Sequence, residues 1–282
     1  VGYPCRIMGI PKTIDNDLFG TDHCPGFPSA AKYIATSISE VYLDSHVYDK
    51  GQITIIEIMG RHAGWLAGAA ALAKLTGCGP DLIYLPEVDF NMEEFLADVS
   101  DIYAKNKNCI VDVSEGIHYP DGTFVSEAKT SATDGFGHAQ LGGLAALLAN
   151  VVKEKTGAKV RGIELSLLQR CGSHVASGTD IEESYRAGKT AVEAAVSGVT
   201  DKMVAFACTR IEDGGYRCDT KLLDLSSVAN YEKKVPVEWI NERGNDISDE
   251  FIRYALPLIQ GETGMVKENG LPRFAKLKKV RA

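Results

Sequence analysis

The sequence predicts an α/β protein built around parallel β-sheets. Short runs rich in β-branched residues alternate with longer amphipathic or alanine-rich stretches along most of the chain. Alternation of this kind is typical of parallel strands whose two faces are covered by helices. The strand-like runs are numerous enough for two such sheets, and no internal sequence repeat is evident.

The expected strands are apolar runs that end at a proline, a glycine or a cluster of polar residues. Pro11 stops the first run, because its ring cannot continue a ladder of backbone hydrogen bonds. A loop is expected over 117–136, with a hairpin around Pro120-Asp121-Gly122, which is a turn signal. The expected strands cover residues 6–10, 52–59, 82–85, 109–113, 160–167 and 203–208.

The expected helices are marked by residues that cap helix ends. Asn91 and Ser248 can accept hydrogen bonds from the free amides of a first helical turn. Gly157 follows a stretch that ends in lysines, which is where a C-cap is expected. Asp180 and Glu183 have the spacing of a capping box. The expected helices cover residues 65–74, 91–104, 139–155, 180–197 and 248–254, and the tail after residue 261 has no periodic pattern.

The composition is that of an ordinary soluble globular chain. Its 282 residues are 45% hydrophobic and 24% charged, which is enough for one large or two moderate cores. No apolar run approaches the roughly 20 residues of a membrane span, and no signal peptide opens the sequence, so we expect a cytoplasmic protein. The formal net charge of -8 disfavours nucleic acid or an anionic membrane as a partner.

The seven cysteines are odd in number and form no CxxC pair. This pattern predicts reduced, mostly buried thiols and argues against a zinc site. Four histidines have no ligand spacing and are interpreted as structural or surface residues: His62, His118, His138 and His174.

The segment with the richest chemistry follows the first expected strand. Lys12, Thr13, Asp15 and Asp17 stand directly after Pro11. Asp15 can take a proton from an attacking hydroxyl, Asp17 can hold or orient a divalent cation, and Lys12 can neutralise a transferring phosphate. Ligands of open α/β sheets bind at such strand ends. Asp and Asn are also common in turns and caps, so spacing alone leaves both interpretations open.

The same segment resembles the 6-phosphofructokinase family, and three further segments match that family in order. They are Met59-Gly60-Arg61 after one strand, Glu115 after another, and Leu168-Gln169-Arg170 before a helical stretch. The similarity runs from about Cys5 to about Leu258. Lys12 makes the chain resemble the pyrophosphate-dependent branch of the family.

The resemblance implies a fold of two Rossmann-like parallel-sheet lobes with the sugar held between them. Residues 27–165 would be the fructose-6-phosphate-binding lobe, while residues 1–26 and 166–282 would form the donor-binding lobe and a C-terminal extension. Family members begin with a Gly-Gly-Asp loop that cradles the donor, and none precedes Val1 here. We therefore expect an N-terminally incomplete chain with an incomplete first lobe and deficient donor binding. An incomplete sheet would expose an apolar edge and be poorly stable alone.

The resemblance also implies a role for each site residue. Asp15 would be the catalytic base, and Lys12 and Arg61 would stabilise charge on the transferring phosphoryl group. Asp17 would bind Mg²⁺. The residues implied to contact the sugar phosphate are Thr13, Ile14, Asp15, Met59, Gly60, Arg61, Glu115, Arg161 and Arg170.

Two positions depart from the family pattern. Leu167 stands where many members have a histidine, which removes one contact to the substrate. Gln52 stands where many tetrameric members supply an arginine across a subunit interface. The resemblance implies a homodimer or homotetramer, and Lys50, close to Gln52 in sequence, is a candidate substitute for the missing arginine.

The implied reaction moves a phosphoryl group from pyrophosphate to the 1-hydroxyl of fructose 6-phosphate and gives fructose 1,6-bisphosphate, a step of glycolysis. ATP is the alternative donor. A chain without a donor loop could instead be a non-catalytic regulatory subunit that binds sugar phosphate, although such a subunit would not need Asp15. A nucleotide-dependent dehydrogenase is disfavoured because no GxGxxG follows a strand.

Overall fold

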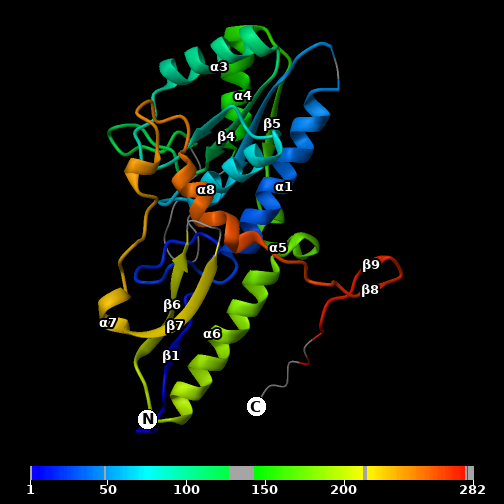
Figure 1. Ribbon diagram of the computed structural model, residues 1–282. Helices are drawn as coiled ribbons and strands as arrows, with labels where there is room; N and C mark the ends of the chain where they lie inside the picture. The colour runs from blue at the N-terminus through cyan, green and yellow to red at the C-terminus, as the bar shows by residue number, and fades with distance from the viewer. Residues whose placement is uncertain (1, 48, 127–142, 212–214, 277, 279–282) are drawn as a thin grey trace.

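The computed structural model describes residues 2–47, 49–126, 143–211, 215–276 and 278. Two sheets dominate these residues and lie at opposite ends of the molecule (Figure 1). The larger has the strand order β3-β4-β2-β5 and the smaller has the order β1-β6-β7. The strands are β1 (Met8–Gly9), β2 (Ile53–Ile58), β3 (Leu82–Tyr84), β4 (Cys109–Ser114), β5 (Val160–Glu164), β6 (Lys202–Arg210) and β7 (Tyr216–Asp224).

The larger sheet is parallel and is apolar on both faces. Every residue of β2 and β4 is buried, and the two strands pair from Ile53 opposite Cys109 to Ile58 opposite Ser114. Helices cover both faces, as burial of a parallel sheet requires. One face packs on α3 (Met92–Asn106) and α4 (Leu144–Thr156), and the other packs on α1 (Phe27–Ser45), α2 (Trp65–Gly68) and the 3₁₀ helix η1 (Ala69–Thr76).

The smaller sheet is mixed. β1 runs parallel to β6, whereas β6 and β7 form an antiparallel ladder. The α/β class is confirmed, but β7 was not among the expected strands and makes this sheet only partly parallel. One face is covered by α6 (Gly178–Val196), whose Ala187 and Ala191 pack on Val204 and Phe206, and α7 (Leu225–Val228) lies on the other.

Capping residues place most helix ends as predicted. The Asn91 side chain accepts hydrogen bonds at the start of α3, and Gly157 ends α4 with a φ of 68°. The predicted capping box at Asp180 is wrong, because Ser177 is the N-cap of α6 and Asp180 lies inside the first turn. Ser248 precedes α8 (Asp249–Ala255) as expected but makes no side-chain capping hydrogen bond.

Two helices differ from expectation. The stretch 65–74 is α-helical only over α2 and then tightens into η1. A Cβ at Gly68 would lie 2.7 Å from the Phe251 ring, so this short helix is pressed against its neighbour. The α1 helix was not predicted; it begins after Gly26, which has a left-handed φ of 98°. The expected start of α4 at residue 139 lies outside the described residues.

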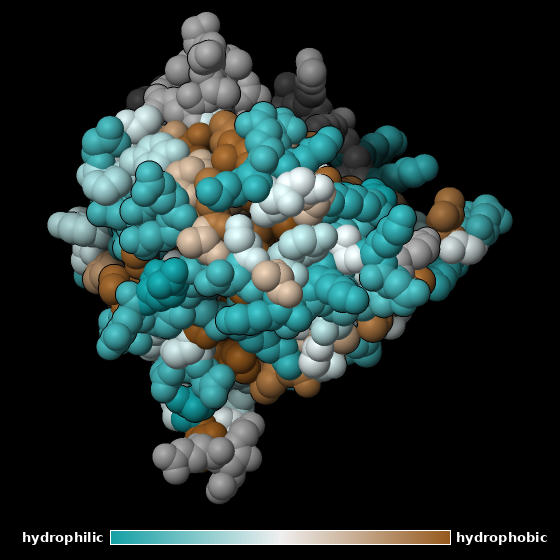
Figure 2. All heavy atoms as spheres, turned by 90° about the horizontal axis from the view of Figure 1, so that it is seen from above, coloured by the Kyte–Doolittle hydropathy of each residue, from teal (hydrophilic) through white to brown (hydrophobic). Residues whose placement is uncertain are grey.

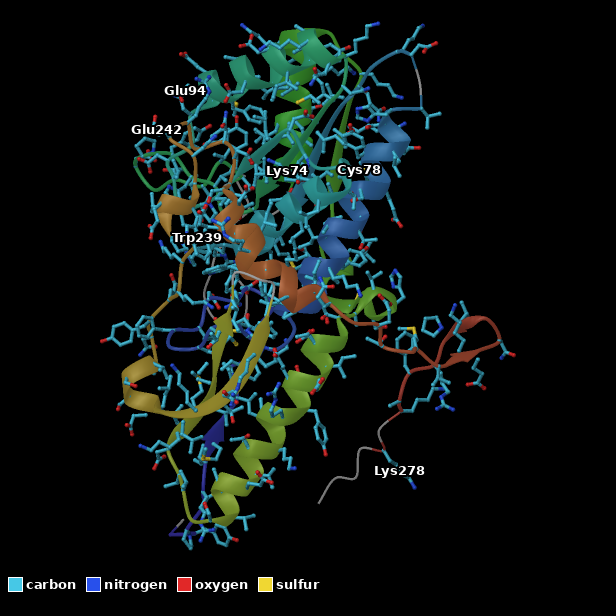
Figure 3. All side chains as sticks on the ribbon, viewed as in Figure 1. Lys74, Cys78, Glu94, Trp239, Glu242 and Lys278 are labelled. Carbon is cyan, nitrogen blue, oxygen red and sulfur yellow. The ribbon has the colours of Figure 1, made fainter. Side chains whose placement is uncertain are left out.

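The segment after β7 returns to the helices of the larger sheet. α8 and the 3₁₀ helices η3 (Val237–Trp239) and η4 (Leu256–Ile259) pack there, around Trp65. The Trp65 ring centroid lies 6.1 Å from that of Trp239 and 5.1 Å from that of Tyr254. Figure 3 shows Trp239 beside α8. The tail forms a short hairpin of β8 (Lys267–Glu268) and β9 (Leu271–Pro272).

The division into lobes at residues 26/27 and 165/166 stays a prediction.

Apolar surface is unevenly distributed over the described residues. Seen from the end that carries α3, mostly hydrophilic side chains cover the molecule (Figure 2). An apolar groove of about 830 Å³ runs between β1 and α6, lined by Met8, Ile10 and Val192 among others. No helix in the described part of the chain is long and apolar enough to cross a membrane.

All seven cysteines are free thiols. Three of them are buried, whereas Cys5 and Cys171 are exposed. The prediction of mostly buried thiols is therefore wrong for these two positions.

Candidate active site

Asp15 and Asp17 lie in the loop that follows β1. Asn16 between them is buried, and its φ of 59° lies in the left-handed region, which asparagine tolerates better than most residues. Its amide group donates to the Tyr254 hydroxyl at 2.8 Å, and its Oδ1 accepts from the Cys24 amide at 2.9 Å. These contacts fix the turn between the two aspartates.

Asp15 sits in a partly buried and charged environment. Burial raises the pKa of its carboxyl, and the charge of Asp17 raises it further. A hydrogen bond from Thr13 and the charges of Lys12 and Arg170 act in the opposite direction. The Thr13 hydroxyl lies 3.4 Å from the Asp15 Oδ2 and accepts from the Asp15 amide at 3.2 Å. The structure thus brings four of the predicted site residues to one carboxylate.

The predicted Met59-Gly60-Arg61 segment follows β2 and lies beside Glu115, which follows β4. The Gly60 amide donates to Glu115 Oε1 at 3.2 Å. The pKa of Glu115 is raised by burial and by the charge of Asp15, and lowered by the charge of Arg61. Glu115, Arg61 and Asp15 are therefore close enough to influence one another, although they come from three separate segments.

Gly60 is required by the tight turn of its own loop. Its φ is 131°, and a Cβ there would lie 2.6 Å from the Ala63 carbonyl oxygen. The Ser114 hydroxyl donates to the Gly60 carbonyl at 2.5 Å. The loop after β2 is thus held against the end of β4.

A pocket of about 260 Å³ joins the loop after β1 to the starts of α1 and α6. Its lining includes Lys12, Ile14 and Arg170 of the predicted site. Asp180 is buried at its edge and accepts from the amides of Gly26 and Ser29. The pocket therefore presents the cationic side chains of Lys12 and Arg170, which suit an anionic ligand, whereas the amides at the start of α1 are already bound by Asp180.

Gln169 stands in one of the segments that match the family, but no role was predicted for it. It is buried in α5 (Leu168–Cys171), just before the 3₁₀ helix η2 (Ser173–Val175). Its Oε1 accepts from the Met59 amide at 3.2 Å, and its Nε2 donates to the Ser166 carbonyl at 3.0 Å. It therefore ties the helix of Arg170 to the loop of Arg61. The signal available in the sequence was its place beside Arg170.

Arg161 lies apart from this cluster. It is exposed near the start of β5, where it pairs with Thr54 of β2. The other site residues gather beyond Ile58 at the far end of β2, four residues away, which is about 13 Å along a strand. Its contact with the sugar phosphate stays a prediction.

Asp17 is a suitable oxygen ligand for a hard divalent cation. Burial raises the pKa of its carboxyl, and the charge of Glu232 adds to the effect, so a cation beside it would relieve an existing electrostatic cost. Within the described residues, one other group has donor atoms close together: Asp22, His23 and Cys208. There the Asp22 carboxylate is already held by both terminal nitrogens of Arg210 at 2.8 Å.

Comparison with known proteins decides the family. A family profile described as Phosphofructokinase matches residues 3–195, more than half of the chain. The chain belongs to the phosphofructokinase family. This phosphofructokinase is 44% identical over 284 residues to the pyrophosphate–fructose 6-phosphate 1-phosphotransferase of Halomonas elongata. It is 45% identical over 286 residues to the enzyme of the same name from Xanthomonas campestris.

These matches cover nearly all of this phosphofructokinase but only part of its relatives. The two alignments include 100% and 99% of the chain and 67% of each relative. A crystal structure of pyrophosphate-dependent phosphofructokinase from Marinobacter aquaeolei superposes with a TM-score of 0.84 at 40% identity, covering 99% of this chain and 68% of that one. The chain thus spans about two thirds of the length of the relatives it matches.

Proposed function

We propose that this phosphofructokinase transfers a phosphoryl group from pyrophosphate to the 1-hydroxyl of fructose 6-phosphate. The observation that carries the proposal is the position of Glu115, which binds the Gly60 amide beside Arg61 and is close enough to Asp15 and Arg61 for both charges to shift its pKa. A base, a cation and a hydrogen-bonding carboxylate in one place are what phosphoryl transfer to a sugar hydroxyl requires. The names of the Halomonas and Xanthomonas relatives support the same reaction.

In this proposal Asp15 accepts the proton of the 1-hydroxyl as that oxygen attacks phosphorus. Its raised pKa suits the role, because a base closer to the working pH keeps more affinity for the proton it removes. Arg61 and Lys12 stabilise the charge of the transferring group. Glu115 accepts hydrogen bonds from the sugar and so orients the attacking oxygen.

The remaining predicted residues position the sugar phosphate in this proposal. Arg170 and Lys12 supply the positive charge of the pocket, and Ile14 contributes to its lining. Thr13 precedes Ile14 in the same turn and hydrogen-bonds to Asp15. The backbone amides of Met59 and Gly60 donate to Gln169 and Glu115 in this structure, so their proposed contact with the sugar phosphate requires an exchange of partners. Arg161 would contribute at the 6-phosphate. Residues 27–165 would form the sugar-phosphate lobe.

The cofactor in this proposal is Mg²⁺, held by Asp17. When bound, the ion would neutralise charge on the donor's phosphate oxygens. The donor is pyrophosphate rather than ATP because of Lys12 and the relatives' names. A cytoplasmic homodimer or homotetramer completes the proposal.

The test is Asp15→Ala in the full-length protein, with turnover and the dissociation constant of fructose 6-phosphate both measured. Removal of a general base should lower kcat by about 10²–10⁴-fold while the affinity for the sugar phosphate changes much less. Asp121→Ala is the control, because Asp121 lies on the exposed hairpin tip. Assays with pyrophosphate and with ATP identify the donor. An unchanged kcat in Asp15→Ala would remove Asp15 as the base, and turnover with ATP alone would overturn the choice of donor.

A further inference from the structure

A short segment far along the chain contacts both loops of the candidate site. Residues 232–235, here called the strap, lie more than 200 residues after Asp17 in sequence. The backbone amide of Lys233 donates to the Asp17 carbonyl at 2.7 Å. The backbones of Glu232 and Leu18 form an isolated antiparallel β-bridge. The strap therefore runs directly along the loop that carries the catalytic aspartates.

The three hydrogen bonds of the Lys233 ammonium group all go to oxygens of the same loop. Its Nζ donates to the Asp22 carbonyl at 2.7 Å, to the Asn16 Oδ1 at 3.2 Å and to the Thr21 carbonyl at 3.3 Å. An ammonium group has three N–H donors, and three oxygens surround this one. Lys233 thus binds the protein rather than a ligand, which distinguishes it from Lys12.

The other side of the strap holds the loop after β2. The Trp65 indole N–H donates to the Lys233 carbonyl at 2.8 Å, and the Lys233 Nζ lies 4.8 Å from the centre of the Trp65 ring. The amides of Val235 and Gly64 both donate to Glu87 Oε1, at 2.9 and 2.8 Å. The strap is therefore fixed directly to Trp65, and through Glu87 to Gly64, in the loop and helix start that follow Arg61.

We propose that Lys233 is a positioning residue that holds the Asp15–Asp17 turn at a fixed place relative to the Arg61 loop. The inference rests on the proposed function, since it assigns these two loops to one reaction. The strap contacts both loops: Lys233 binds Asp17 and Asn16 on one side and accepts from the Trp65 indole on the other. A displacement of about 1 Å between reacting groups can cost roughly 10²-fold in rate.

The test compares Lys233→Met with Lys234→Met in the full-length protein. Methionine keeps most of the length and apolar stem of lysine but removes the charge and all three donors. Lys234 is the adjacent residue, and its side chain is exposed. We expect Lys233→Met to lower kcat by about 10–100-fold with less than about threefold change in KM for fructose 6-phosphate, and Lys234→Met to change neither.

Hydrogen exchange gives a second readout that does not depend on activity. Lys233→Met should speed exchange in peptides that cover residues 15–22 and 60–65, while peptides from α3 stay as in the unsubstituted protein. Lys233→Arg keeps the charge with a different donor geometry and should recover part of the lost turnover. Lys233→Gln removes the charge but keeps a polar end, and it is the decisive variant if Lys233→Met does not fold.

The outcomes separate this inference from the proposed function. Unchanged kcat in folded Lys233→Met, or in Lys233→Gln if methionine is not tolerated, would overturn the positioning role. Unchanged exchange over residues 15–22 and 60–65 would overturn it as well. If the unsubstituted protein transfers no phosphoryl group from pyrophosphate or ATP, the proposed function fails, and the exchange data still decide whether Lys233 holds the two loops.

Discussion

His23 is fully buried between two carboxylates. Its Nδ1 lies 3.0 Å from an oxygen of Asp22, and its Nε2 lies 2.7 Å from an oxygen of Glu183. Only the doubly protonated ring can donate on both sides, so this arrangement selects the imidazolium. Burial opposes that charge, but hydrogen bonds to Asp22, Cys208 and Glu183 outweigh it and raise the pKa of His23 to about 10.

This histidine predicts a specific dependence of stability on pH. An unfolded histidine has a pKa of about 6.5, so between pH 6.5 and about 10 the folded state binds a proton that the unfolded state lacks. Stability from His23 is complete below pH 6.5 and falls as pH rises, by up to about 1.4 kcal/mol per pH unit. Urea unfolding of the protein and of His23→Gln from pH 6 to 9 measures the difference. Parallel curves for the two proteins would contradict a charged His23.

The sequence allowed us to predict which polar residues follow the strands, but not which distant residues they contact. Arg61 and Glu115 could be predicted to meet because β2 and β4 are neighbouring parallel strands of one sheet. Asp15 follows β1 of the other sheet, and its place beside them was implied only by the family resemblance. The contacts of His23 and Lys233 could not be predicted, since their partners at Glu183 and Asp22 lie in distant segments with no local signal. The same reasoning explains Asp180, whose spacing indicated a cap although its carboxylate binds α1 instead.

At the scale of elements, the larger sheet was the most predictable part. β2 and β4 are mostly apolar and buried at every residue, interrupted only by Thr54 and Glu57 in β2 and by Asp112 and Ser114 in β4. Such runs have few alternatives to a buried parallel strand. β7 was missed because charged residues recur along it and only Cys218 of its nine residues is buried, so no continuous apolar run marks it. The α1 helix was missed because its start carries no polar cap, only Gly26 and Pro28.

The contact between the ends of β2 and β4 can be tested through a pair of glycines. A Cβ at Gly116 would lie 1.8 Å from the Arg61 carbonyl oxygen, so Gly116→Ala must push the Arg61 loop away. We expect a loss of about 1–3 kcal/mol in the free energy of unfolding, together with lower turnover. Gly188 lies inside α6 with no atom within 4 Å of its Cβ position, so Gly188→Ala should stabilise the protein by up to about 1 kcal/mol. Equal unfolding midpoints for the two variants would disprove the close contact at Gly116.

At the scale of the whole molecule, the segment from Val237 to Ile259 connects regions distant in sequence. Phe251 is fully buried and its ring lies 6.0 Å from that of Trp65. The same segment supplies Tyr254, whose hydroxyl donates to the Asp22 carbonyl at 2.8 Å. The helix at 248–254 was predictable from its cap and apolar residues, but the surface on which it packs was not, because that choice depends on long-range shape.

Loss of this connection should lower global stability. Phe251→Ala removes a fully buried ring and is expected to cost about 3–5 kcal/mol. Phe274→Ala is the matched control, because that ring is 64% exposed and should matter by less than about 0.5 kcal/mol. Urea unfolding followed by circular dichroism measures both. A cost below about 1 kcal/mol for Phe251→Ala would mean that the C-terminal segment is not part of the cooperative unit.

The two tryptophans of the chain stand together, with Trp65 and Trp239 6.1 Å apart and nearly perpendicular. All indole emission from this protein therefore comes from one spot. That spot lies where the strap, α2 and the C-terminal segment meet, so the wavelength and intensity of the emission follow a single junction rather than an average over the fold. The intrinsic fluorescence of the protein therefore reports on the place where these segments pack together.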